Sequence, residues 1–195
     1  MTTLDSSMAA SRANAAFEQR LRLVGPDDWP RPTPCSEWDV RALVNHVIGG
    51  NRRYTMLLHG APAESVNRTR AEDHLGADPL TAFRTTAREL AAAFREDGAL
   101  TRIAHHPIGD RTGADLLAMR VLDVTVHAWD LARALNIDDA LDSDAVEFAL
   151  AHTEVIEAGR AHGSFAIATG PPRIAASPQA RLLHLAGRST EGGRS

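Results

Sequence analysis

Apolar residues recur at helical spacing along most of this 195-residue chain. Steps of three and four residues place them on one face of a helix, as Phe17 and Leu21 show in the first such stretch. We find no convincing set of strands. The pattern predicts long helices over residues 6–24, 39–60, 78–98, 114–135 and 142–161, and a short helix over residues 177–187.

Capping residues mark where several of these helices begin. Asp39 or Ser36 is expected to cap the second helix, and Asp142 or Ser143 the fifth, because short polar side chains accept hydrogen bonds from the first free N–H groups. The stretches without helical period are predicted to be connections at residues 61–77 and 99–113 and a disordered tail at 188–195.

These elements predict an all-α fold. Long helices joined by shorter connections are typical of an up-and-down four-helix bundle, here with an extra helix and a short C-terminal extension. The expected division is a helical bundle over residues 1–160 and an extension with one short helix over residues 161–195.

Composition excludes several kinds of chemistry. All 21 basic residues are arginine, so neither a Schiff-base lysine nor a P-loop lysine is available. The net charge of -4 gives no reason to expect a nucleic-acid partner. The single cysteine, Cys35, precludes an internal disulfide and a cysteine zinc cluster, and we expect it to be packed and unreactive.

The sequence also carries an expectation about location. The first ten residues lack the basic start and apolar core of a secretory signal. No apolar run approaches the roughly 18 residues that a transmembrane helix needs. We therefore expect a cytoplasmic protein without a membrane partner, and we leave its oligomeric state open, with a homodimer as one alternative.

Four chemically active side chains gather on the helix predicted at 114–135. At about 100° per residue, Arg120, Asp123, His127 and Asp130 fall within about a quarter turn of one another. Asp123 and His127 are four residues apart, so one helix presents an oxygen and a nitrogen to the same point. That arrangement is typical of metal ligands on helices.

A structural network is the alternative interpretation. Arg120 would pair with Asp123 and His127 with Asp130, with no metal involved. His46 on the second helix favours the metal, because it adds a second nitrogen to the set. Two nitrogens and one oxygen leave coordination positions open, which is characteristic of catalytic sites.

Two glycines follow His46 in the predicted second helix. Gly49 and Gly50 each cost a helix on the order of 1 kcal/mol compared with alanine. They indicate that some group approaches the backbone of this helix closely.

The motifs "TPCSEWDVRALVNHVIGG" and "DVTVHAWDLARA", in this order, resemble a known family. They are similar to the mycothiol-dependent, maleylpyruvate-isomerase-like group of the DinB/YfiT-like metal-binding bundles, in its short single-domain form. "HPIGDRTG" and "SPQARLLHLAGRST" are similar as well, so the resemblance covers most of residues 10–190.

The resemblance implies a divalent metal, usually zinc and sometimes nickel, held by His46, Asp123 and His127. It also implies a thiol-dependent transferase or isomerase that uses a low-molecular-weight thiol such as mycothiol on a small electrophile. The chain departs from the family pattern in two ways that affect the expected activity. Asp123 stands where glutamate is common, and the isomerase proper has a further C-terminal domain.

Two more residues are candidates for a catalytic role. Asp130 would orient His127, and Arg120 would either hold a substrate carboxylate or pair with Asp123. The rival functions are a metal-dependent hydrolase that uses a metal-bound hydroxide, with His105 or His106 near its mouth, and a non-enzymatic metal- or ligand-binding bundle.

Overall fold

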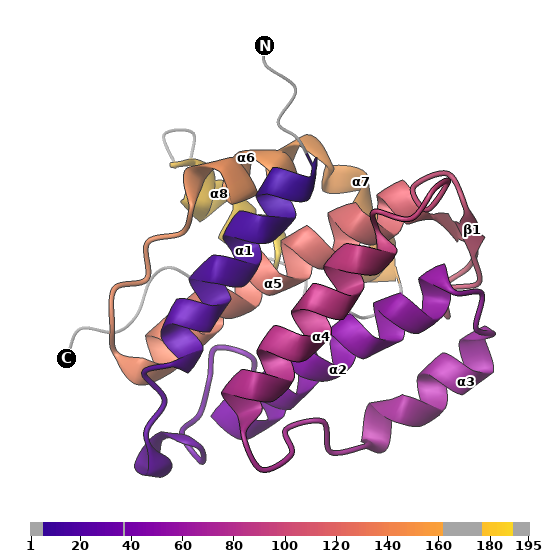
Figure 1. The fold of residues 1–195 in the computed structure, drawn as a ribbon. Helices are drawn as coiled ribbons and strands as arrows, with labels where there is room; N and C mark the ends of the chain where they lie inside the picture. The colour runs from indigo at the N-terminus through magenta and orange to yellow at the C-terminus, as the bar shows by residue number, and fades with distance from the viewer. Residues whose placement is uncertain (1–5, 37, 162–176, 189–195) are drawn as a thin grey trace.

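A computed structural model describes residues 6–36, 38–161 and 177–188. Within these residues the all-α prediction is confirmed, apart from one very small sheet (Figure 1). The elements are α1 (Ser6–Leu21), η1 (Pro26–Asp28), α2 (Val40–Leu58), α3 (Ala63–Arg68), η2 (Thr69–Ala71), α4 (Pro79–Ala93), β1 (Ile103–Ala104), β2 (Arg111–Thr112), α5 (Gly113–Leu135), α6 (Ser143–Ala151), α7 (Thr153–Ala161) and α8 (Pro178–Leu185).

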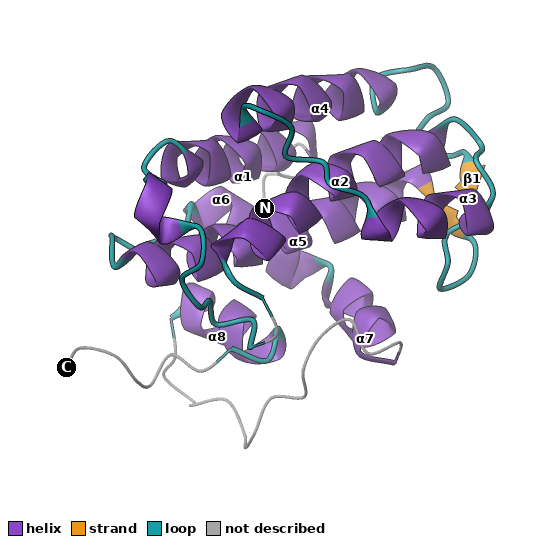
Figure 2. Cartoon of the chain, turned by 90° about the horizontal axis from the view of Figure 1, so that it is seen from below, coloured by secondary structure: helices purple, strands orange, loops and turns teal. Residues whose placement is uncertain are grey.

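The long helix α5 lies at the centre of the bundle. Helices α1 and α2 both pack against it, and α4 packs against α1 and α2 from the other side (Figures 1 and 2). Helix α6 contacts both α1 and α5, and α8 packs against α6. Because α5 is covered on several sides, most of its residues are buried, including Arg120, His127 and Asp130, whereas Asp123 stays partly exposed.

The helices begin where capping chemistry allows. The Asp39 carboxylate accepts from the Ala42 N–H at 2.7 Å at the start of α2, and the Asp142 carboxylate caps α6. Helix α5 begins with a reciprocal capping box between Thr112 and Asp115. The caps of α2 and α5 fix the starts of the two helices that carry the candidate ligands.

Four expectations about local structure were wrong in detail. The predicted connection at 61–77 contains α3 and η2. Helix α3 buries only Val66, so its sequence shows no helical repeat of apolar residues. The connection at 99–113 contains the two-residue antiparallel pair β1–β2. The first helix ends at Leu21 rather than at residue 24, and α4 ends at Ala93 rather than at residue 98.

The predicted fifth helix is interrupted at His152. The Phe148 carbonyl, which would accept the backbone N–H of residue 152 in a continuous helix, instead faces Nδ1 of the His152 ring at 2.8 Å. The chain therefore forms α6 and α7 in place of one helix.

The predicted C-terminal helix is present as α8. Its Leu182 and Ala186 join the main hydrophobic core, so α8 is packed against the bundle. Of the predicted disordered tail, only Arg188 belongs to the described residues. None of the described helices has the length and hydropathy needed to cross a membrane.

Candidate metal centre

The structure brings His46 on α2 together with Asp123 and His127 on α5. Their ligand atoms all lie within 4.8 Å of one another. Oδ1 of Asp123 is 3.1 Å from Nε2 of His46 and 3.3 Å from Nε2 of His127. One carboxylate oxygen and two imidazole nitrogens therefore converge on one point, and this donor set suits zinc and related divalent ions.

Trp38 forms one wall of this group. Its ring centroid is 4.5 Å from that of His46 and 5.5 Å from that of His127. The backbone carbonyl of Trp38 accepts from both the N–H and the hydroxyl of Thr33, which fixes the loop before α2. The side chains of His46 and Asp123 are 23% and 21% exposed, so solvent reaches the group.

A buried carboxylate determines how His127 is oriented. Oδ2 of Asp130, which is fully buried, lies 2.9 Å from Nδ1 of His127. With a proton on Nδ1, the Nε2 lone pair of His127 points towards Asp123 and is free for a metal. The residues present therefore fit a divalent ion.

No local pattern in the sequence identifies the residue that holds Asp130. Arg188, just after α8, donates from Nη2 to Oδ2 at 2.7 Å and from Nε to Oδ1 at 3.2 Å. The same Nη2 lies 2.8 Å from Sγ of Cys35. Arg188 is 58 residues from Asp130 and lies in the predicted tail, so spacing along the chain could not identify it as the partner.

Arg120 holds the other oxygen of Asp123. Its Nη1 donates to Oδ2 of Asp123, while Nε and Nη2 donate to Oδ1 of Asn51 at 3.0 and 2.8 Å. Nη2 also donates to the Val47 carbonyl at 2.6 Å. Because the Arg120 side chain is only 3% exposed, this geometry supports a role in positioning Asp123 and gives no support to contact with a substrate.

The two glycines of α2 explain how these groups fit. A Cβ atom on Gly50 would lie 2.6 Å from Nη1 of Arg120, and one on Gly49 would lie 2.3 Å from Cδ2 of His74. The predicted close approach to the backbone is therefore present, and the approaching groups are an arginine and a histidine.

Gly50→Ala is expected to destabilise the protein by about 1–3 kcal/mol, because the Arg120 guanidinium must shift away from Asp123. This cost outweighs the gain of about 1 kcal/mol in helix propensity. Urea denaturation measures the difference. Gly25→Ala is the control, since its Cβ would meet only ordinary contact at 3.4 Å. Equal or greater stability of Gly50→Ala would show that Arg120 is not tightly held.

The charges in the group are strongly coupled. Burial opposes ionisation of Asp123, but His46 and His127 outweigh it and hold the pKa of Asp123 well below its usual range. Burial lowers the pKa of His46 to about 4 despite the pull of Asp123. For His127 burial is outweighed by Asp123 and then Asp130, which raise its pKa well above the usual value. Without metal, His127 is thus the protonated partner and His46 the neutral one.

The structure contains the contacts expected from both interpretations of the α5 motif. The pairs Arg120–Asp123 and His127–Asp130 of the structural network are formed. The convergence with His46 is formed as well. His105, one of the two loop histidines, takes no part in this group, because it is exposed and faces Asp110 at 2.9 Å.

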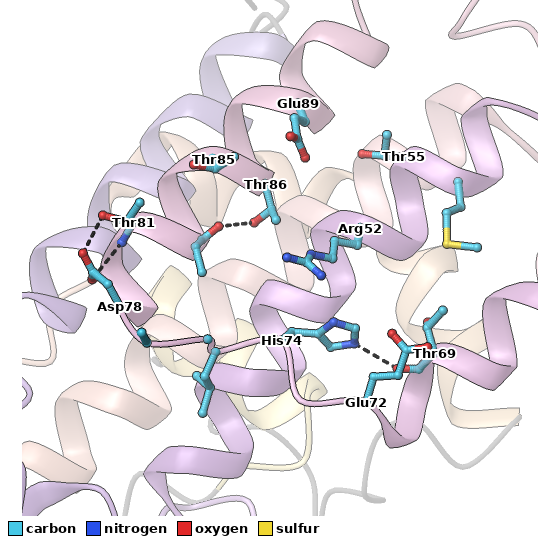
Figure 3. Close-up of a pocket in the computed structure, with 15 residues that line it drawn as sticks. Arg52, Thr55, Thr69, Glu72, His74, Asp78, Thr81, Thr85, Thr86 and Glu89 are labelled. Atoms are coloured by element: carbon cyan, nitrogen blue, oxygen red, sulfur yellow. Dashed lines mark hydrogen bonds between the residues drawn. The ribbon is translucent and has the colours of Figure 1, made fainter.

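A hollow lies on another face of α2 (Figure 3). This groove, of about 730 Å³, lies between α2, α4 and residues 69–78, and Thr55 and Thr86 are among its lining residues. Thr55 is nine residues from His46, which is half a turn round the helix. The hydroxyl of Thr86 accepts from Asn51 at 3.2 Å, and Asn51 accepts from Arg120, so a buried polar network reaches from the candidate metal centre to this groove.

The family model of the mycothiol maleylpyruvate isomerase N-terminal domain matches residues 10–132. The chain belongs to this family. Two uncharacterized proteins from two strains of Mycobacterium tuberculosis are each 35% identical to it over 146 residues, which is 74% of this chain and 75% of theirs.

Solved structures agree on the fold. The crystal structure of the mycothiol-dependent maleylpyruvate isomerase aligns with a TM-score of 0.56 and 20% identity, over 65% of this chain and 59% of that one. A histidine-to-alanine mutant of that isomerase aligns with a TM-score of 0.60 and 17% identity, over 73% and 65%. The chain thus spans less than two thirds of the isomerase, and the likeness shows a shared fold.

The residues of the candidate centre lie partly inside and partly outside the family match. His46, Asp123 and His127 lie within residues 10–132, whereas Arg188 lies beyond them. The segment after the family domain therefore supplies the cation that holds Asp130.

Proposed function

We propose that this chain binds one divalent metal ion through His46, Asp123 and His127 and acts as a transferase or isomerase that depends on a low-molecular-weight thiol. The observation that carries the proposal is the convergence of two imidazole nitrogens and one carboxylate oxygen within 4.8 Å. Family membership supports it, because a mycothiol-dependent isomerase has the same fold. Zinc is the metal we propose, with nickel as the alternative, and mycothiol is the thiol.

A divalent ion at this position would stabilise the thiolate form of a bound thiol at neutral pH. The chain offers few nucleophiles of its own, because it has no lysine and a single cysteine. The Sγ of that cysteine, Cys35, contacts Arg188 and Asp130. An external thiol is therefore the simplest source of a nucleophile, and the electrophile remains a small molecule of unidentified structure.

The chain's own residues have separate tasks in this proposal. Asp130 keeps the proton of His127 on Nδ1, and Arg120 holds the second oxygen of Asp123. The carboxylate of Asp130 is fully buried and engaged by His127 and Arg188. It is therefore badly placed as the general base that a hydrolase would need, which favours the thiol over water as the nucleophile.

Cobalt substitution tests the thiol proposal. Mycothiol, or a simpler thiol at high concentration, is expected to give sulfur-to-cobalt charge-transfer absorption in the near ultraviolet. His46→Ala should lack this absorption, and Cys35→Ser should keep it. If no thiol perturbs the cobalt spectrum while esters or amides are hydrolysed, the protein is a hydrolase instead.

Proton release on metal binding follows from the coupled charges. At about pH 6 the metal should displace about one proton per chain, because His127 is protonated and must bind as the neutral ring, whereas His46 is already neutral. Metal affinity should accordingly fall as pH decreases. Titration calorimetry in two buffers of different ionisation enthalpy measures the proton count. Release of no proton would mean that His127 is not a ligand.

A further inference from the structure

Arg53 is a buried cation beside the candidate metal centre. It lies on α2, seven residues after His46 and on nearly the same face of the helix. The residue is only 6% exposed. Its Nη2 donates to the backbone carbonyl of His46 at 3.2 Å, so the guanidinium lies along α2 towards that histidine.

No carboxylate pairs with Arg53 in the part of the chain that the structure describes. The other arginines of the centre differ in this respect: Arg120 is paired with Asp123 and Arg188 with Asp130. A buried charge without a partner is costly, and proteins normally supply an opposite charge or remove the group.

The neighbouring charges increase this cost. Burial, followed by the guanidinium groups of Arg70 and Arg120, lowers the pKa of Arg53 to about 10. Asp123 acts in the opposite direction, but its two oxygens already face Arg120 and the two histidines. Arg53 therefore has two other arginines near it and only an already engaged carboxylate to oppose them.

Gly49 makes room for this arrangement. A Cβ atom on Gly49 would lie 2.7 Å from Nη1 of Arg53 as well as against the His74 ring. The helix thus accepts a weak helix former where the Arg53 guanidinium lies against it.

We infer that Arg53 binds an anionic group, a carboxylate, of the small molecule that occupies the metal centre. This inference rests on the proposed function, since it places the ligand between Arg53 and the metal. A guanidinium presents two parallel N–H groups that match a carboxylate, and a bound carboxylate supplies the charge that the protein does not. The ligand class is a small carboxylic acid with a second polar group that reaches the metal.

Calorimetric titration of the zinc-loaded protein with succinate tests this site, with dimethyl succinate as the uncharged control. We expect succinate to bind and its ester not to bind. Arg53→Met should weaken succinate binding at least tenfold, and Arg53→Lys should restore part of the affinity. Arg52→Met is the matched control, because Arg52 is the exposed neighbour that lines the groove of Figure 3, and it should leave succinate affinity unchanged.

Thermal unfolding gives a readout that a structural arginine would not give. Without succinate, Arg53→Met should unfold at a higher temperature than the wild type, because a buried unpaired charge has been removed. With succinate, only the wild type should gain stability. A lower unfolding temperature for Arg53→Met together with unchanged succinate affinity would overturn the inference.

Zinc analysis of the same samples separates the two proposals. A wild-type protein that carries no zinc but binds succinate through Arg53 would contradict the metal proposal and leave the carboxylate site standing. A fully zinc-loaded wild type whose succinate affinity is insensitive to Arg53→Met would contradict the carboxylate site alone.

Discussion

Replacement of His46 or His127 by alanine is expected to remove the bound metal. The wild type, purified without chelator, should carry about one divalent ion per chain, as one three-ligand site requires. Each variant should retain less than about a tenth of an ion, because two remaining donors do not hold zinc through gel filtration. Elemental analysis of the purified proteins measures the content.

His59→Ala is the matched control for these variants. His59 is an exposed histidine that faces Glu96 at 2.9 Å, away from the candidate ligands, so its replacement should leave the metal content unchanged. Retention of a full equivalent of metal by both His46→Ala and His127→Ala would rule out this site.

Asp123→Asn is expected to affect both metal binding and folding. The amide keeps the shape of the side chain but loses the charge, so metal affinity should fall about 100-fold or more. The metal-free protein should lose about 3–5 kcal/mol of unfolding free energy, because Arg120 and the protonated His127 keep their charges without the anion between them. Competition with a chromophoric chelator and urea denaturation measure the two effects.

Asp110→Asn provides the comparison for Asp123→Asn. The Asp110 side chain is 64% exposed in its pair with His105, so removing its charge should change neither quantity. Unchanged metal affinity together with the expected loss of stability in Asp123→Asn would favour the structural network, in which Asp123 pairs with Arg120 and His127 and binds no metal.

The sequence by itself determined the helices and the α5 half of the site. Amphipathic periodicity and capping residues are local properties, so α2 and α5 were predicted close to their observed bounds, and the start of α4 close to its observed position. The four-residue step from Asp123 to His127 fixes their common direction on any regular helix. His46 was predicted as their partner from its residue type and from the family resemblance.

Only the tertiary structure decided which groups surround these three. Asn51 and Arg53 face the centre because α2 packs against α5, and Arg188 reaches Asp130 because α8 packs against α6. Such contacts join residues far apart in the chain, and no local pattern encodes them. Burial then sets the charges: removal from water makes His46 neutral, while the nearby Asp123 carboxylate keeps His127 protonated.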